Sequence, residues 1–108
     1  MKIKQDQSLS IRGTSFHDVT ITVDPAVFSA KYPDYDGYGD KSTRDWTFSY
    51  GGEVFTVYDW KETSEHSPDL PHPSVFWSQP QVTLHIGSRL GTSQEVEFKS
   101  ALLSSLND

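Results

Sequence analysis

The sequence predicts an α+β fold: an antiparallel sheet of about four strands, with a short helix and a C-terminal helix packed on one face. Several short segments alternate apolar and polar residues, which is typical of half-buried strands. A pair of glycines separates two of these segments, as in a β-hairpin. The last segment of the chain instead has apolar residues at helical spacing.

Chain length and aromatic content favour one folded domain. The 108 residues suit a single unit over residues 1–108, in which we expect residues 1–9 to be flexible. Only 34% of the residues are hydrophobic, but 13% are aromatic, and each buried ring removes about 150–250 Å² from water. These rings supply enough apolar area to favour a core over disorder.

Charge and cysteine content narrow the possible partners and compartment. Fifteen Asp and Glu against nine Lys and Arg give a formal charge of −6, which disfavours general nucleic-acid binding and attraction to anionic membranes. The chain has no Cys, which suits a reducing cytoplasm. It begins without the apolar run of a signal peptide, and no segment is apolar for long enough to span a bilayer. We therefore expect a cytoplasmic protein with no membrane partner.

The first half of the chain predicts a strand, a short helix and a loop. Residues 16–23 alternate and predict a strand. Its apolar residues, which should face the core, are Val19, Ile21 and Val23. A short helix should follow at residues 26–31, because Asp24 can cap it and Pro25 suits its first position. Residues 34–41 have no apolar period, so we expect a loop.

Residues 44–50 and 53–60 predict a hairpin, because Gly51 and Gly52 between them suit a two-residue turn. Counting outward from this turn pairs Tyr50 with Glu53, Phe48 with Phe55, Trp46 with Val57, and Arg44 with Asp59. These side chains share an apolar face, which we expect the helices to cover. We interpret the oppositely charged pair at its end as a structural ion pair rather than a catalytic pair.

The second half predicts a long loop, a strand and a helix. Residues 64–80 are rich in Pro and should form an irregular loop, with one helical turn near residues 75–77 whose aromatic side chains anchor it to the core. Residues 81–87 alternate and predict the last strand, and residues 95–106 predict an amphipathic helix. Their apolar residues are Val82, Leu84 and Ile86 in the strand and Val96, Phe98, Leu102, Leu103 and Leu106 in the helix.

Helices on one side of the sheet would leave its other face open as a candidate binding site. Tyr58, Trp60 and His85 on that face could stack on a ligand ring and hydrogen-bond to it. His85 and Lys61 could meet negative charge on the ligand. The hydroxyl groups of the expected site come from Thr47, Thr56 and Thr83. In the alternative interpretation, Tyr58 and Trp60 pack beneath the proline-rich loop.

Two short motifs are the most distinctive part of the chain. They are Phe55-Thr56-Val57-Tyr58-Asp59-Trp60-Lys61 and Leu84-His85-Ile86-Gly87-Ser88. Together they resemble a group of small bacteriophage-encoded proteins in which a hairpin strand ending in Tyr-Asp-Trp-Lys precedes a strand ending in His-Ile-Gly. The resemblance covers residues 10–106 and implies a phage accessory protein in the bacterial cytoplasm. Many such proteins counter host defences.

Two functions from different classes follow. We favour a homo-oligomeric binding protein that captures a small signalling nucleotide, or masks a host defence protein, with its open face. The net acidity disfavours an anionic ligand unless cations gather at the site. The alternative is a hydrolase of phosphodiester or glycosidic bonds, with His85 as acid or base oriented by Asp59 or Asp45. Because the sequence has no oxyanion motif, Lys61 or Arg44 would have to stabilise the negative charge of the hydrolase's transition state.

The sequence predicts neither a metal nor a cofactor. The four His residues lack the paired spacing of zinc sites. The acidic loop at residues 34–40 lacks the Glu that completes a calcium loop, and Asx turns explain its Asp residues equally well. Its Gly37-Tyr38-Gly39 segment neither follows a predicted strand nor opens a predicted helix, as a phosphate-binding loop would.

Overall fold

A computed structural model describes residues 2–37, 42–60, 62–63 and 66–108. In this part of the chain one antiparallel sheet has the strand order β1-β4-β5-β6-β2, and β3 also pairs with β4. The strands are β1 (Lys4–Gln5), β2 (Ser15–Val23), β3 (Tyr35–Asp36), β4 (Arg44–Tyr50), β5 (Glu53–Tyr58) and β6 (Val82–Ser88). The helices are α1 (Pro25–Lys31), α2 (Pro73–Phe76) and α3 (Thr92–Ser105). The predicted α+β class is confirmed, with more strands than expected.

The additional strands are two short segments at the outer edge of β4. β1 lies within residues 1–9, which we expected to be flexible, and it pairs Lys4 with Ser49. β3 lies within the expected loop of residues 34–41 and pairs Tyr35 with Asp45. Residues 38–41 of that loop lie outside the described residues. A strand of two residues has no alternation to detect, so only its pairing reveals it.

The predicted hairpin and its register are confirmed. Gly51 and Gly52 have φ angles of 59° and 79°, which glycine adopts without steric cost. The turn pairs Tyr50 with Glu53, and farther along Phe48 with Phe55 and Trp46 with Val57. The hairpin therefore places its large apolar side chains on one face.

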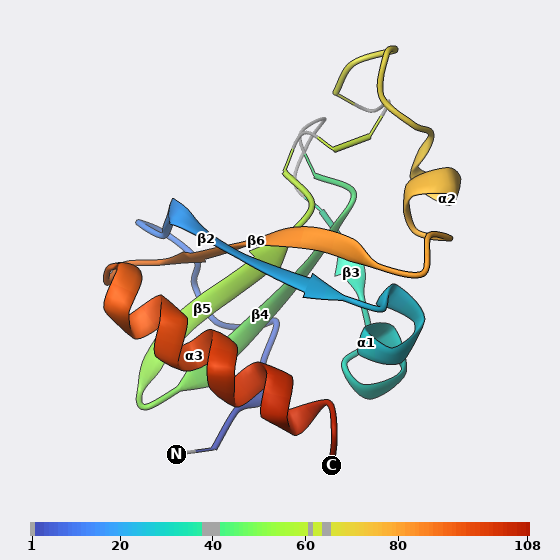
Figure 1. The fold of residues 1–108 in the computed structure, drawn as a ribbon. Coiled ribbons are helices and arrows are strands. Elements are labelled where there is room, and N and C mark those ends of the chain that lie inside the picture. The colour runs from blue at the N-terminus through green and yellow to red at the C-terminus, as the bar shows by residue number, and fades with distance from the viewer. Residues whose placement is uncertain (1, 38–41, 61, 64–65) are drawn as a thin grey trace.

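All three helical segments contact this apolar face, as Figure 1 shows for α3 crossing the sheet. The ring centroid of Phe28 in α1 lies 4.7 Å from that of Trp46. Trp77, at the end of α2, contacts Trp46 edge to face at 5.8 Å. Phe98 in α3 packs against Phe48 at 5.6 Å. The expected core face and the anchoring of the proline-rich segment are thus both confirmed.

The helix boundaries agree with the sequence at α1, whereas α2 spans Pro73–Phe76 instead of residues 75–77 and α3 also begins early. In α1, the Asp24 side chain accepts hydrogen bonds from two backbone N–H groups of the first turn, as expected of an N-cap. α3 begins at Thr92 rather than at residue 95. Its expected core residue Val96 is 51% exposed, whereas Glu95 is fully buried beside Phe98. The buried face of the helix therefore carries a carboxylate, which the apolar pattern did not indicate.

The prediction of an ion pair between Arg44 and Asp59 is wrong, although the predicted register of β4 and β5 is correct. The Asp59 carboxylate accepts hydrogen bonds from the backbone N–H groups of Thr43 and Arg44, at 2.7 and 2.9 Å. The Arg44 guanidinium instead lies 3.3 Å from Asp34 and over the Trp77 ring. β5 ends at Tyr58, so Asp59 lies beyond the strand. The Asp59 side chain can therefore bond to the backbone at the start of β4.

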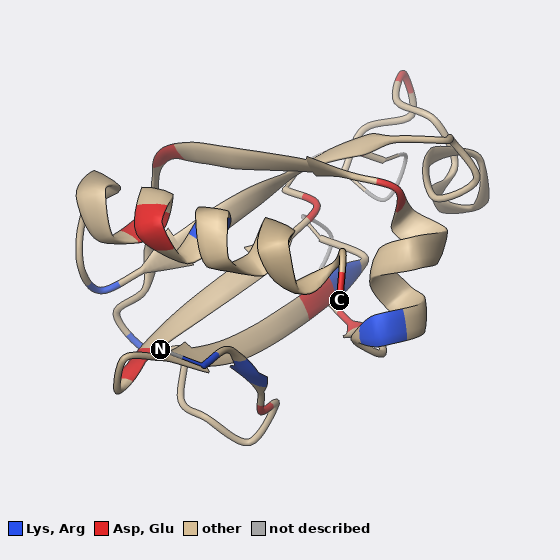
Figure 2. Ribbon diagram, turned by 60° about the horizontal axis from the view of Figure 1, so that its bottom comes forward, with Lys and Arg blue, Asp and Glu red and all other residues tan. Residues whose placement is uncertain are grey.

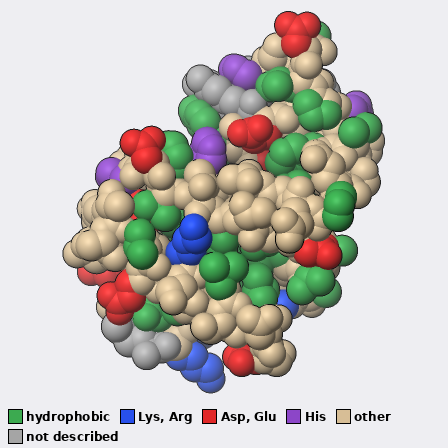
Figure 3. All heavy atoms as spheres, in the orientation of Figure 1, with side chains coloured by type: hydrophobic (Ala, Val, Ile, Leu, Met, Phe, Trp, Pro, Cys, Tyr) green, Lys and Arg blue, Asp and Glu red, His purple; other side chains and the backbone are tan. Residues whose placement is uncertain are grey.

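The charged residues are dispersed over the molecule. Lys and Arg lie on separate elements rather than along one surface (Figure 2). The side chains visible in Figure 3 likewise mix both signs of charge with polar and hydrophobic groups. Of the helices in the described ranges, none has the length and apolar character needed to cross a membrane.

Candidate binding site on the second face of the sheet

The face of the sheet away from the helices, here called the second face, is not open as expected. The N-terminal segment, residues 6–14, passes over it (Figure 1). The Gln7 side chain donates a hydrogen bond to Asp45 at 2.9 Å and accepts one from the backbone N–H of Thr47. The backbone N–H of Asp6 also donates to the carbonyl of Thr47, at 2.8 Å. The segment thereby buries hydroxyl groups that we expected to be exposed.

A hollow of about 160 Å³ remains between this segment and the sheet. Its lining residues are Ile11, Thr14, Ser42, Asp45, Thr47, Thr56, Tyr58 and Trp60. Four predicted site residues, Thr47, Thr56, Tyr58 and Trp60, therefore line one hollow. None of the described residues of the proline-rich loop lines the hollow, and the N-terminal segment takes the covering role that the alternative interpretation gave to that loop.

Gly87 in β6 allows the side chains of the hollow to lie close to the sheet. A Cβ atom at this position would lie 2.7 Å from Oγ1 of Thr56 and 3.5 Å from Cε1 of Tyr58. The first distance is shorter than van der Waals contact permits, so any larger residue must displace Thr56. The glycine of the His-Ile-Gly motif thus helps to shape the hollow.

His85 does not line the hollow. Its ring stacks on Phe16 with centroids 4.2 Å apart, and Tyr58 contacts it edge to face at 5.9 Å. Burial lowers the pKa of His85, and the negative charge of Asp59 only partly opposes this shift. Its Nδ1 atom is buried and has no hydrogen-bond partner among the described residues. These surroundings favour a neutral packing role over proton transfer.

The other predicted site residues also lie away from the hollow or outside the described chain. Oγ1 of Thr83 hydrogen-bonds to Oγ1 of Thr22 at 2.9 Å, across the edge pair β6 and β2. Thr83 is not among the lining residues. Lys61 lies outside the described residues, so its expected role stays a prediction.

Asp45 gives the hollow an acidic character. Burial raises the pKa of its carboxyl group, the hydrogen bond from Gln7 lowers it, and the nearby charges of Asp59 and Asp36 raise it. Burial likewise raises the pKa of Tyr58. None of the described lining residues is Lys or Arg. The hollow is therefore better suited to a group that donates hydrogen bonds than to a phosphate.

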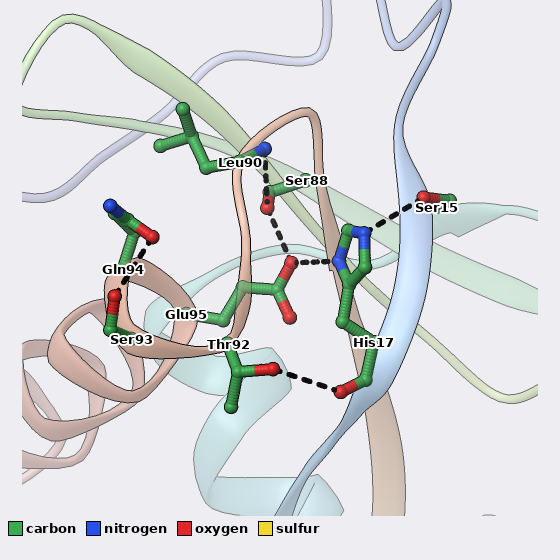
Figure 4. Close-up of polar contacts among 8 residues, drawn as sticks. All are labelled: Ser15, His17, Ser88, Leu90, Thr92, Ser93, Gln94 and Glu95. Atoms are coloured by element: carbon green, nitrogen blue, oxygen red, sulfur yellow. Dashed lines mark hydrogen bonds and ion pairs between the residues drawn. The ribbon is translucent and has the colours of Figure 1, made fainter.

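A second polar cluster, which the sequence analysis missed, joins β2 to α3 (Figure 4). Nδ1 of His17 lies 2.6 Å from Oε2 of the buried Glu95, and the Ser88 hydroxyl donates to the same oxygen. Nε2 of His17 lies 3.2 Å from Oγ of Ser15. One signal was present in the sequence: Glu95 stands at helical spacing from Phe98, where a carboxylate facing the core needs polar partners.

An irregularity in β2 brings this cluster together. The pairing with β6 shifts between Phe16 and Thr20, and Asp18 has a φ of 68°. Such a bulge re-aims the side chains beside it. Here it accompanies a His17 side chain that reaches α3, and Oγ1 of Thr92 also donates to the His17 carbonyl, at 3.4 Å.

The fold and site define a small α+β protein with helices on one face of an antiparallel sheet and a ring-sized hollow on the other. No protein-family model matches the sequence, and no curated protein matches it. In the described ranges, no three His, Asp or Glu side chains gather as a metal site would require.

Proposed function

We propose that this chain is a phage accessory binding protein whose hollow holds the ring of a small ligand, such as the base of a signalling nucleotide. The observation that carries the proposal is the convergence of Tyr58 and Trp60 with Thr47, Thr56 and Asp45 around one hollow. Aromatic rings provide stacking surface, and the hydroxyl and carboxyl groups provide directional hydrogen bonds. The phage origin rests on the two sequence motifs alone.

The size of the hollow limits what can enter it. An apolar cavity of about 150 Å³ accommodates benzene, whereas drug-sized ligands occupy pockets of about 300–1,000 Å³. A hollow of about 160 Å³ therefore suits one ring. A nucleotide bound here would place its base in the hollow and keep its sugar and phosphate outside, away from the buried carboxyl group.

Asp45 supports a preference among ring ligands. When ionised it only accepts hydrogen bonds, so the two N–H donors of an exocyclic amino group suit it better than the single ring N–H that uracil offers between two carbonyl groups. Adenine, guanine and cytosine carry such an amino group, whereas uracil does not. We therefore expect amino-bearing bases to bind more tightly than uracil.

The His85 hydrolase has less support from the geometry. Phe16 covers one face of the imidazole, and burial lowers the pKa of His85. No hydrogen bond found for the described residues joins His85 to Asp59 or Asp45, the carboxylates expected to orient it. The surroundings of His85 therefore support ligand binding better than ligand hydrolysis.

Calorimetry and thermal unfolding with adenosine, guanosine, cytidine, uridine and their monophosphates test the proposal. Ligand at about 100 times its dissociation constant should add roughly 2.7 kcal/mol of stability. Trp60→Ala should weaken binding at least tenfold, whereas Tyr35→Ala, an exposed aromatic outside the hollow, should leave binding unchanged. The bound ligand should be recovered intact after heating.

Two results would contradict the proposal. Equal binding of cytidine and uridine would remove the role given to Asp45. Binding of none of these ligands would exclude base capture and favour the masking of a host protein. Sedimentation of the free and liganded protein would test the expected homo-oligomer.

A further inference from the structure

Ser15, His17 and Glu95 form a chain of hydrogen bonds like that of an activated serine. The Ser15 hydroxyl lies 3.2 Å from Nε2 of His17, and Nδ1 of the same ring lies 2.6 Å from Oε2 of Glu95. In such an arrangement the base lies within reach of the nucleophile, and a third group orients the base. Figure 4 shows the three side chains in this order.

The neighbouring hydrogen bonds determine which imidazole nitrogen can act as a base. The backbone N–H of Leu90 donates to Oγ of Ser88, whose own hydroxyl then donates to Oε2 of Glu95. When Nδ1 of His17 donates to the same carboxylate oxygen, the neutral imidazole carries its proton on Nδ1. Nε2 is left with a lone pair that can accept the Ser15 proton.

Burial falls off along this chain from the carboxylate to the hydroxyl. The Glu95 side chain is fully buried, the His17 side chain is 32% exposed, and Ser15 is exposed. The orienting group is thus shielded from water while the nucleophile is accessible. Contacts between His17 and Glu95 alone would hold the bulge of β2 to α3, so that structural role does not require the Ser15 hydroxyl.

We propose that Ser15 is a nucleophile that accepts the acyl group of small esters, with His17 as general base and Glu95 as the positioning residue. Oγ of Ser15 attacks the carbonyl carbon while its proton passes to Nε2 of His17. The bond to the leaving alcohol breaks, and the alcohol takes that proton. Water then attacks the acyl-serine with His17 again as base, which releases the carboxylic acid and restores the serine. This activity is independent of ligand capture in the hollow.

The expected rate enhancement decides which experiment is suitable. General-base assistance contributes about 10²–10⁴-fold, and backbone donors for an oxyanion would add to it. A reactive Ser15 requires only the contribution of the general base. Covalent modification of the serine is therefore a more direct measurement than turnover, because it identifies the atom that reacts.

The full chain is treated with an alkyl fluorophosphonate, which forms a phosphorus–oxygen bond to a serine and releases fluoride, and peptides are quantified by mass spectrometry. Ser15 should react at least tenfold faster than the exposed Ser93, whose hydroxyl donates to Gln94 instead of an imidazole. His17→Gln should lower the Ser15 rate to that of Ser93. Ser93→Ala should leave it unchanged.

Glu95→Gln tests the positioning role separately. It should slow Ser15 modification at least tenfold in protein that remains folded by circular dichroism, because a neutral amide holds the imidazole less well in the reactive tautomer. If either variant unfolds, the comparison of Ser15 with Ser93 within the unaltered chain still decides the outcome. Equal rates for these two serines would overturn the proposal. So would p-nitrophenyl acetate treatment that acetylates His17 and never Ser15.

Discussion

The ring of Phe98 in α3 lies parallel to the ring of Phe55 in β5, with centroids 4.4 Å apart and an angle of 2° between the ring planes. Both side chains are almost completely buried. Together with the contact between Phe48 and Phe98, this stacked pair joins the C-terminal helix to the hairpin, two elements far apart in the sequence.

Phe55→Ala should lower the free energy of unfolding by about 3–5 kcal/mol, because it removes a buried ring and leaves a cavity beneath Phe98. Val96→Ala, on the exposed side of α3, is the matched control and should change stability by no more than about 0.5 kcal/mol. Urea denaturation monitored by fluorescence measures both. A larger loss for the Val96 variant would mean that the helix faces are reversed.

Gly87→Ala should destabilise the protein by about 1–3 kcal/mol, because the new methyl group would lie 2.7 Å from Oγ1 of Thr56. Thr56→Ala removes that oxygen. The cost of Gly87→Ala should therefore be smaller in the Thr56→Ala background, which a double-mutant cycle of unfolding free energies measures. Additive costs would show that the clash lies elsewhere.

Asp45→Asn should stabilise the folded protein at neutral pH. Burial raises the folded-state pKa of Asp45, so the folded protein binds this proton more tightly than the unfolded chain. The contribution of Asp45 to stability therefore falls as the pH rises from the unfolded value, about 3.9, through the folded-state pKa. Asparagine keeps an oxygen that can accept the hydrogen bond from Gln7.

Urea denaturation of both proteins between pH 3 and pH 7 measures this effect. The stability advantage of Asp45→Asn should be largest at pH 7, shrink as the pH falls through the folded-state pKa and be lost below about 4, where the wild-type carboxyl group is protonated in both states. An advantage that grows on acidification would indicate a carboxylate stabilised by its surroundings.

Asp24→Ala should cost about 1 kcal/mol, because the Asp24 carboxylate accepts hydrogen bonds from the N–H groups of Ala26 and Val27 at 2.9 and 3.3 Å. Asp24→Asn keeps an accepting oxygen and should retain most of the stability. Thermal melts of the two variants provide the comparison. Equal losses would assign the effect to the charge rather than to the cap.

The hollow could be predicted only in part. Tyr58, Trp60, Thr47 and Thr56 were placed on one face by strand alternation and hairpin register, which are properties of the local chain. Their cover could not be predicted, because Gln7 bonds to Asp45 across 38 positions of sequence and leaves no periodic signal. His85 was assigned to the site, but it does not line the hollow. Strand alternation predicts which face of the sheet a side chain lies on, but it does not predict that Phe16 packs against His85 there.

By itself the sequence determined the hairpin, the cap of α1 and the apolar face of the sheet. Each depends on a local requirement: positive φ at Gly51 and Gly52, a side-chain acceptor at Asp24, or alternation along a strand. Only the tertiary structure decided how the second face is covered and which groups meet Glu95. Burial of that carboxylate requires His17 and Ser88, which come from separate strands and meet α3 only in the folded chain.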